Sequence, residues 1–571
     1  MASNQEIAAF LNELSILLEL RGENAFRIRA YTNAARTFEM LEENISAMLQ
    51  QGTLTSLKGV GQGLADLVEE FVRTGTAADL EEAKASIPAG LLDMLKIPGL
   101  GPKKIRTIHT KLGLENLQDL ERACAENLLS DLSGFGKKTQ ENIIKGIEHL
   151  RHYQERWRAD EALQDARALR DALAQNPHTI RVEIAGSLRR YKETVKDIDL
   201  VISTARPEAV AQTFIDHPSV AQVVARGQTK TTVLLASGIQ ADLRLVADAH
   251  FPCILHHFTG SKEHNIALRA RAQSMGLRLN EYGLLRASEE LQCKDEAALF
   301  AHLDLSYIPP EMREGLGEVE AAAAGTLPEL VDAADIRGML HLHSTYSDGR
   351  DSIESMALAV RQRGYAYMGI SDHSRSAAYA GGLREDDILR QHDEIDALND
   401  ELEGIHIFKG IESDILPDGA LDYEDALLER FDFIVASVHS RFNMSEREMT
   451  RRLVRAIEHP SSTILGHLSG RLLLEREGYP VDIDALTEAA AAHDVAIEIN
   501  ANPHRLDIDW RHLRSARDRG VKIALNTDAH RIEGLDHLHF GIGAARKGWL
   551  RREDIINTLD TGAIAAYFAK L

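Results

Sequence analysis

Asp197 and Asp199 are separated by one residue within the apolar run DIDLVIS. Alternate residues of an extended strand project from the same face, so we expect their carboxylates to lie side by side. Asp242, in a second apolar run, ADLRLV, is a third acid that could join them. Such a group suits two Mg²⁺ ions about 3.5 to 4 Å apart, which would favour attack of a 3'-hydroxyl on a nucleoside triphosphate. An isolated D-x-D pair could equally be a solvated strand face.

The segment GSLRRYK, which precedes the two aspartates, adds groups that could hold a triphosphate. Gly186 and Ser187 can present backbone and hydroxyl donors, and Arg190 can neutralise phosphate charge. This combination favours a nucleotidyl-transfer site over an exposed acidic strand.

The C-terminal third places metal-ligand residues at the ends of seven apolar runs: MLHLHSTYSD, YMGISDH, IFKGIESD, FIVASVH, TILGH, VAIEIN and IALNTDAH. In a βα barrel these ends meet at one mouth, the usual place for catalysis. Imidazole mixed with carboxylate suits Mn²⁺ or Zn²⁺ better than Mg²⁺ alone. The predicted ligands are His341, His343, Asp348, His373, Glu412, His439, His467, Asp528 and His530. We expect the histidines outside this pattern to be structural or exposed: His392, His459, His493, His512, His537 and His539.

The order G-S-x-R-R, D-x-D and a distal Asp resembles the nucleotidyl-transfer palm of family X DNA polymerases. The run HHFTGSKEHNIALRARAQSMGLRLNEYGL is similar to the nucleotide-binding segment of that family, and SYIPPEMREGLGEVEAA continues the likeness into its thumb. The resemblance implies that Phe258, Gly260, Asn265 and Arg269 contact the incoming nucleotide or the template base. Lys262 is a further candidate for the triphosphate.

Two positions depart from that family. His257 stands where a tyrosine often crowds the 2' position of the sugar, so discrimination against ribonucleotides is not predicted. Gly63 and Leu67 occupy the positions that match the lyase lysine of DNA polymerase beta. A Schiff-base lyase of that kind is therefore not expected.

The H-x-H, S-D-H and D-A-H motifs of the last third resemble the polymerase and histidinol phosphatase (PHP) family. This resemblance implies a distorted (β/α)7 barrel with up to three metal ions, and 3'-5' exonuclease, apurinic-site endonuclease or 3'-phosphatase activity. All nine predicted ligands match the ligand pattern of the family. Arg471, in GHLSGR, and Arg505, in EINANPHRLDI, are candidates for holding the phosphate of the substrate.

Residues 1–150 carry an apolar-x-Gly-apolar-Gly pattern three times, each followed by a predicted helix: LKGVGQGLADLV, IPGLGPKKIRTI and LSGFGKKTQENI. Paired glycines allow positive φ and a close approach of backbone N–H groups to phosphate. The repeats resemble helix-hairpin-helix motifs, which grip the DNA backbone without reading sequence. Their predicted DNA contacts are Gly59, Gly61, Gly99, Gly101, Lys103, Lys104, Gly134, Gly136, Lys137 and Lys138.

The chain of 571 residues is long enough for several domains. We expect a helical DNA-binding region over 1–150, an α+β nucleotidyltransferase palm with thumb over 151–316, an Ala-rich linker over 317–335 and the barrel over 336–571. Of the 65 basic and 88 acidic residues, 37 and 43 lie within 1–316, so most of the net charge of -23 belongs to the last third. Residues 1–316, in which basic and acidic residues are nearly equal in number, can still form a basic groove.

The three cysteines fit neither a disulfide framework nor a Cys-x-x-Cys metal site, and the N-terminus lacks the features of a secretory signal. We expect a cytoplasmic monomer, nucleoid-associated when bound to DNA, that takes primed or gapped duplex DNA and dNTPs.

The combined pattern predicts a polymerase for gap filling in base excision repair or end joining, with a barrel that trims blocked ends. Three alternatives stay open. The barrel could be an inert scaffold, the palm could be inactive in a DNA-end-binding protein, or the barrel could be a phosphatase for a small metabolite.

Overall fold

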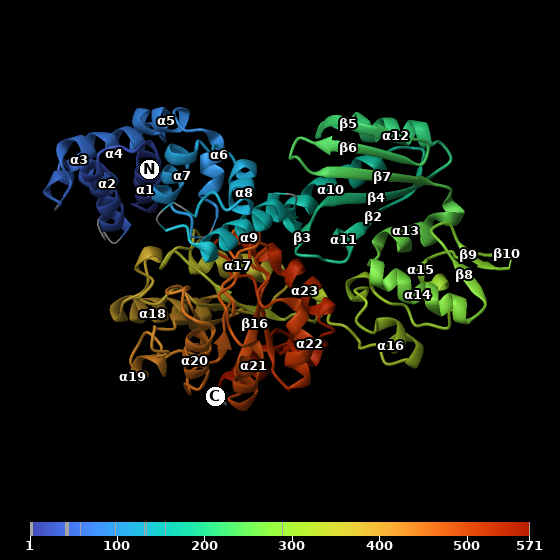
Figure 1. Cartoon of the computed structure of the whole chain (residues 1–571). Coiled ribbons are helices and arrows are strands. Elements are labelled where there is room, and N and C mark those ends of the chain that lie inside the picture. Colours follow the sequence, from blue (N-terminus) through green and yellow to red (C-terminus); the bar gives the residue numbers. More distant parts are fainter. Residues whose placement is uncertain are drawn as a thin grey trace. The chain divides into compact units, whose positions relative to one another are not determined.

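The structure, a computed structural model, describes residues 4–39, 45–57, 59–97, 99–130, 132, 134–154, 156–287 and 289–569. It divides into two compact units, Met1–Glu155 and Arg156–Leu571. Figure 1 shows an all-helical first unit (blue to cyan) and a second unit that contains all the strands. No helix in the described part of the chain is long and apolar enough to cross a membrane.

The first unit is helical because its apolar residues recur at intervals of three and four. In α4, for example, Leu64, Leu67 and Val68 are buried in the core of the unit, and Phe71 packs against it. The helices are α1 (Asn4–Arg21), α2 (Ala25–Glu39), α3 (Ile45–Gln51), α4 (Gln62–Thr74), α5 (Ala78–Ala85), α6 (Ala89–Met94), α7 (Pro102–Leu112), α8 (Leu117–Ala125) and α9 (Lys137–Gln154).

The three glycine turns precede α4, α7 and α9. Only the first glycine of each pair has a positive φ: +93° at Gly59, +79° at Gly99 and +89° at Gly134. The second glycine, as at Gly61 and Gly101, is extended and caps the helix that follows. Each pair thus supplies the one positive φ that the turn needs. An added Cβ would meet nothing within 4 Å at any of the six, so these backbones face open space.

The second unit begins with a five-stranded sheet in the order β2-β4-β7-β6-β5. β4 and β7 run parallel in its centre, and their register pairs Asp199 with Asp242. The elements are β1 (Trp157–Arg158), α10 (Ala159–Ala174), β2 (Thr179–Ile184), α11 (Gly186–Arg189), β3 (Thr194–Val195), β4 (Asp197–Thr204), α12 (Pro207–Ile215), β5 (Val220–Arg226), β6 (Lys230–Leu235) and β7 (Gln240–Val246).

A smaller subdomain follows the sheet and ends in the Ala-rich segment. Val319 and Ala322 of that segment pack into the core of this subdomain, whereas Val331 packs into the barrel core, so residues on both sides of 325 are tied to neighbouring domains. The elements are α13 (Phe251–Thr259), α14 (Lys262–Ser274), β8 (Leu277–Leu279), β9 (Leu284–Arg286), β10 (Glu289–Leu291), α15 (Glu296–Ala301) and α16 (Glu318–Ala324).

The last part is a barrel of seven parallel strands whose order in the sheet follows the sequence. A parallel bridge between Leu342 and Ala529 brings the first and last strands together. The strands are β11 (Gly338–Leu342), β12 (Tyr367–Ile370), β13 (His406–Asp414), β14 (Phe433–Ser437), β15 (Ile464–Leu465), β16 (Ala496–Asn500) and β17 (Ile523–Asn526). The helices are α17 (Ile353–Gln362), α18 (Glu385–Glu401), α19 (Asp425–Leu428), α20 (Glu446–Ile457), α21 (Ile483–Ala492), α22 (Trp510–Asp518), α23 (Leu538–Lys547) and α24 (Thr561–Phe568).

The period of two along each strand divides the apolar residues of the barrel into two clusters. Ile497 belongs to the larger cluster between strands and helices, whereas Ala496 belongs to a smaller cluster that includes Ile564 and Phe568 of α24. Glu498 shares the strand face of Ala496 and is fully buried. One face of β16 thus changes from apolar to acidic along its length.

A buried ion-pair network joins the sheet domain to the barrel. The ammonium group of Lys547 is fully buried, lies 2.5 Å from Glu314 and donates to the backbone oxygen of Arg190. Glu314 also lies 3.1 Å from both Arg190 and Lys192. Since Lys547 ends α23 and Arg190 ends the α11 turn, this network fixes the turn against the barrel.

Glu314→Gln is expected to lower the free energy of unfolding by about 3 kcal/mol, because it leaves the buried Lys547 without a carboxylate. Burial opposes ionisation of Glu314, but Lys547, Arg190 and Lys192 hold its pKa at about 2, below the ordinary 4.5. The stabilisation is therefore complete above pH 4.5 and is lost as the pH falls towards 2. Urea unfolding monitored by tryptophan fluorescence measures the free energy of unfolding of the wild type and the variant.

The difference between the wild type and Glu314→Gln should shrink between pH 5 and pH 3. An equal difference at the two pH values would contradict this account. Glu553→Gln removes an exposed carboxylate of the barrel. We expect this control to change stability by less than about 0.5 kcal/mol.

Candidate active sites

The three palm acids predicted from the sequence lie on the paired strands β4 and β7. Asp197 and Asp199 are two residues apart on β4, and Asp199 is directly opposite Asp242 on β7. Gly186 packs so closely that an added Cβ would lie 2.4 Å from Asp199 Oδ2. The turn predicted to hold a triphosphate thus contacts the predicted catalytic acids.

Negative charge is in excess at this point of the sheet. Burial, together with Asp197 and Asp242, raises the pKa of Asp199 to about 7. Burial and the charge of Asp242 also raise the pKa of Asp197. Lys230, on β6, lies 2.6 Å from Asp242 Oδ2 and supplies one positive charge. The acids therefore favour further cations, and their oxygens are the ligands that Mg²⁺ prefers.

Arg190 connects this turn to the predicted nucleotide-binding segment. Its guanidinium donates to the backbone oxygen of Thr259, just before Gly260, and pairs with Glu314. These contacts hold the two loops together. The Arg190 guanidinium is already paired with Glu314 in this structure. Its predicted contact with a triphosphate therefore stays a prediction.

The other residues predicted to bind nucleotide lie along α13, α14 and the turn between them. Phe258 is half-buried under the Arg244 guanidinium, at 4.3 Å from the ring centroid. Asn265 is buried and donates to the backbone oxygen of His257. Lys262 and Arg269 are exposed, and Ser187 is half-buried.

In the barrel, the predicted histidines lie close to three carboxylates. Five imidazole nitrogens lie 2.9 to 3.6 Å from oxygens of Glu412. Three lie 3.2 to 3.7 Å from oxygens of Asp528, and three lie 3.3 to 3.7 Å from oxygens of Asp348. The structure brings all nine predicted ligands to one end of the barrel: His341, His343, Asp348, His373, Glu412, His439, His467, Asp528 and His530.

Within this cluster, three groups have ligand atoms that all lie within 4.8 Å of one another. They are His343, Asp348, His373 and His530; His341, His343 and Asp528; and His373, Glu412 and His439. Among the described residues, all groups of this kind lie in the barrel. His467 is outside them, but its Nε2 donates to Glu412 at 2.9 Å.

Several imidazole nitrogens are buried without a hydrogen-bond partner. Within the cluster these are Nε2 of His341, both ring nitrogens of His343, Nδ1 of His373 and Nδ1 of His467. Burial and the neighbouring His530 lower the pKa of His343 to about 3, so its ring is neutral. A buried, neutral and unpartnered imidazole is costly unless it binds a cation. The donor set therefore fits divalent metal ions.

Two further acids that the sequence analysis did not select support the cluster. Glu498 is buried and accepts a hydrogen bond from Nδ1 of His341 at 2.7 Å. Asp414 accepts from Nδ1 of His439 at 2.5 Å. Such bonds fix the ring so that Nε2 faces the cluster. The i, i+2 spacing of Asp414 from Glu412 was a usable signal, because both residues share one strand face.

The two arginines predicted to hold substrate phosphate occupy different environments. Arg505 lies at the cluster, with Nε 3.4 Å from Asp528 Oδ2. Arg471 pairs with Asp509 and donates to the backbone oxygens of Arg505 and Leu506, so it braces the loop that carries Arg505.

In the helical unit, Lys103, Lys137 and Lys138 are exposed at the starts of α7 and α9. Lys104 donates to the backbone oxygen of Gly99 and closes the turn that it follows. Leu67 is buried in the helical core and Gly63 is exposed at the start of α4.

Family models match most parts of the chain. A helix-hairpin-helix domain matches residues 2–77, and a SAM-like helix-hairpin-helix tandem matches 91–148. The DNA polymerase beta thumb matches residues 254–314, and the PHP domain matches 339–502. The chain is also similar to the DNA polymerase/3'-5' exonuclease PolX of Bacillus subtilis, with 40% identity over 99% of both chains. The chain belongs to the family X DNA polymerases.

This family membership agrees with the fold: helix-hairpin-helix motifs, a polymerase thumb and a barrel of the PHP type. Barrel relatives also occur as separate proteins. A probable phosphatase of Syntrophotalea carbinolica is 30% identical over 39% of this chain and 92% of its own length. One from Thermoanaerobacter is 28% identical over 30% of this chain and 71% of its own length. We conclude that a family X polymerase with these groups of metal-ligand residues depends on divalent metal ions for its activity.

Excess Mn²⁺ is expected to raise the melting temperature of the barrel by about 5 °C or more, because it binds the folded cluster only. His343→Asn should remove most of this increment, since His343 belongs to two of the three ligand groups. Calorimetry with and without Mn²⁺ measures the increment.

His392→Asn is the matched control. His392 is also buried, but its ring packs against Phe431 on the outer side of the barrel core. The control should lower the melting temperature without changing the Mn²⁺ increment. An increment that survives in His343→Asn would contradict the assignment of these ligands.

Proposed function

We propose that the chain is a DNA-directed DNA polymerase that fills short gaps during DNA repair, with a metal-dependent phosphoesterase in its barrel. The single observation that carries the polymerase assignment is the register of β4 and β7, which puts Asp199 opposite Asp242 and beside Asp197. The relation to the Bacillus subtilis polymerase over the whole chain supports the same assignment.

In the proposed palm site, Asp197, Asp199 and Asp242 hold two Mg²⁺ ions. When bound, these ions lower the pKa of the primer 3'-hydroxyl and neutralise charge on the departing pyrophosphate. Gly186 and Ser187 offer donors to the triphosphate.

Nucleotide selection is assigned to the α13–α14 segment. Phe258, Gly260, Asn265 and Arg269 would contact the base and sugar, and exposed Lys262 would reach the triphosphate. Asn265 donates to the backbone oxygen of His257, so it ties α14 to the last turn of α13.

In the barrel, the nine residues would hold up to three ions of Mn²⁺ or Zn²⁺, which supply Lewis acidity at a phosphate ester. Arg505 would orient the phosphate, and Arg471 would position Arg505. The proposed reactions are 3'-5' exonuclease, apurinic-site endonuclease and 3'-phosphatase cleavage of DNA ends. The likeness of the barrel to probable phosphatases favours the last of these as a second activity.

The helix-hairpin-helix turns would hold the backbone of gapped or primed duplex DNA, and dNTPs are the proposed substrates. We propose that the protein acts as a cytoplasmic monomer that associates with the nucleoid through DNA. The domains are assigned as DNA-binding region 1–150, palm and thumb 151–316, connection 317–335 and barrel 336–571.

Single-site variants should separate the two activities. Asp197→Ala is expected to reduce Mg²⁺-dependent extension of a one-nucleotide gap by at least about a hundredfold and to leave Mn²⁺-dependent nucleotide release intact. His341→Ala should do the opposite. Gel analysis of both products from one labelled substrate measures the two rates.

Each of the other functions has its own outcome in this assay. Nucleotide release that persists in His341→Ala would show that the barrel is a scaffold. Binding of DNA by the wild type without extension of the primer would show that the palm is inactive. Preferential hydrolysis of histidinol phosphate over recessed 3' ends would indicate a metabolite phosphatase. Any of these results would overturn the proposal.

Lys137→Ala combined with Lys138→Ala is expected to weaken binding to duplexes of unrelated sequence equally and to lower the salt slope of binding by about 1 to 2. Fluorescence anisotropy over a salt series measures both quantities. Lys111→Ala with Lys145→Ala removes two other exposed lysines of α7 and α9 and should leave the slope unchanged. Loss of affinity for one sequence alone would contradict backbone recognition.

A further inference from the structure

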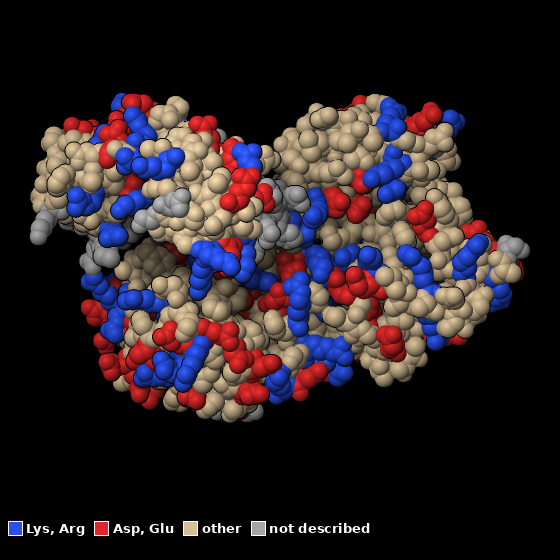
Figure 2. Space-filling model, in the orientation of Figure 1, with Lys and Arg blue, Asp and Glu red and all other residues tan. Residues whose placement is uncertain are grey.

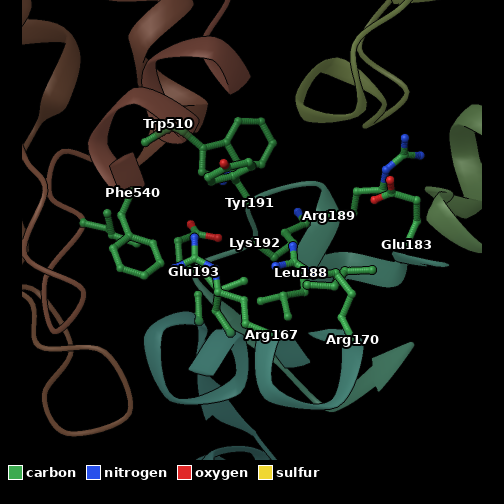
Figure 3. Close-up of a pocket in the computed structure, with 15 residues that line it drawn as sticks. Arg167, Arg170, Glu183, Leu188, Arg189, Tyr191, Lys192, Glu193, Trp510 and Phe540 are labelled. Atoms are coloured by element: carbon green, nitrogen blue, oxygen red, sulfur yellow. The ribbon is translucent and has the colours of Figure 1, made fainter. Parts of the chain in front are cut away.

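A hollowed seam runs between the palm domain and the barrel, within the second compact unit. Its first hollow, of about 200 Å³, is lined by α10 and residues 188–193 of the palm and by α22 and α23 of the barrel. A second hollow, of about 500 Å³, lies along α22 and the end of α23. Trp510 lines both, so we treat them as one feature, the seam groove. Figure 3 shows the first hollow, with Arg167 and Arg170 on the palm side and Trp510 and Phe540 on the barrel side.

The seam groove is cationic in a protein that is strongly acidic. Its lining includes eight Lys and Arg residues but three Asp and Glu residues, whereas the whole chain has a net charge of -23. Figure 2 shows Lys and Arg side chains gathered where Figure 1 places α22, while acidic side chains are prominent over α18 to α20. A local excess of this sign attracts a polyanion.

Two of the eight cations have no carboxylate partner. Six are paired with acids within 4.0 Å, for example Arg189 with Glu296 and Arg519 with Asp484. Arg167 and Arg514 are exposed, and no acid among the described residues lies within ion-pair distance of either. Their charge is therefore available to a ligand.

The Arg514 guanidinium is held in a fixed orientation. Its central carbon lies 4.3 Å from the centroid of the Trp549 ring, and Nη1 donates to the backbone oxygen of Leu316. Stacking on an indole fixes the plane of the guanidinium and leaves its remaining N–H groups for an acceptor at its edge. Planar, forked donors of this kind match the oxygens of a phosphate.

The first hollow of the seam groove is lined by residues that neighbour both proposed catalytic sites in the chain. Leu188 and Arg189, which line it, follow the turn of Gly186 and Ser187 directly. Leu506, on the opposite wall, follows Arg505, whose guanidinium lies 3.4 Å from Asp528. A strand lying in the first hollow would therefore contact chain segments that carry residues of both proposed sites.

We propose that the seam groove binds the phosphate backbone of a single-stranded segment of DNA. This inference rests on the proposed function, because it takes DNA as the substrate, and it adds a contact surface outside both catalytic sites. A single strand is favoured over a duplex because the half-buried ring of Tyr191 lines the groove beside its cations, and an aromatic ring can stack on an unpaired base.

The experiment compares two double variants of the full-length chain with equal charge change. Arg167→Glu with Arg514→Glu reverses the two unpaired cations of the groove. Arg206→Glu with Arg447→Glu reverses one exposed palm arginine and one exposed barrel arginine that lie outside the groove lining. Fluorescence anisotropy of a labelled oligothymidylate in EDTA, over a salt series, measures binding without cleavage.

The groove variant is expected to bind the oligothymidylate about tenfold more weakly, with a salt slope smaller by about 1.4, whereas the control changes affinity less than about twofold. Equal losses in the two variants, or none in either, would overturn the proposal. A third result would also overturn it: the groove variant loses binding of dTTP or inorganic phosphate but keeps its affinity for the oligonucleotide. The groove would then be a site for a small anion.

Extension of a one-nucleotide gap by the groove variant distinguishes this inference from the proposed function. Neither Arg167 nor Arg514 belongs to the palm site, so extension should remain within about twofold of the wild type. Absence of extension by the wild type would refute the polymerase assignment, and the anisotropy result would still decide whether the groove binds a single strand.

Discussion

The structure of the second unit depends on buried charge that the protein alone does not balance. In the barrel, three carboxylates and six histidines, most of them buried, meet at one end, and some ring nitrogens have no hydrogen-bond partner. In the palm, three aspartates lie together, and Lys230 pairs with one of them, Asp242. Desolvation makes either arrangement costly without cations. Metal ions remove this desolvation cost when they bind, which gives the sites their affinity for the ions. The buried charge that destabilises the metal-free protein is therefore the same charge that supports the proposed metal-dependent reactions.

The rest of the fold positions these groups by simple rules. Parallel pairing of β4 with β7 brings residues 43 positions apart, Asp199 and Asp242, opposite each other. In the barrel, parallel strands in sequence order bring their ends to one mouth, and the period of two selects which residues face it. The Glu314–Lys547 network then holds the palm turn against the barrel, so the two sites belong to one compact unit.

Much of this could be predicted from the sequence, because the ligands follow apolar runs of strand length and the glycine turns repeat. Glu498 and Asp414 were missed because a strand pattern alone does not separate a metal ligand from the acid that orients it. The pairing of Arg190 with Glu314 depends on contacts 124 residues apart, which local spacing does not reveal. The seam groove is formed by α10 and α22, which the sequence separates by more than 300 residues, so it was not predictable.

Anomalous diffraction at the manganese edge, from crystals of the full-length protein grown with Mn²⁺, tests the central claim most directly. The account predicts peaks among the barrel groups of Glu412, Asp528 and Asp348, and further density between Asp197, Asp199 and Asp242. Crystals that show no peak at either cluster, with the histidines hydrogen-bonded only to one another and to the acids, would contradict it.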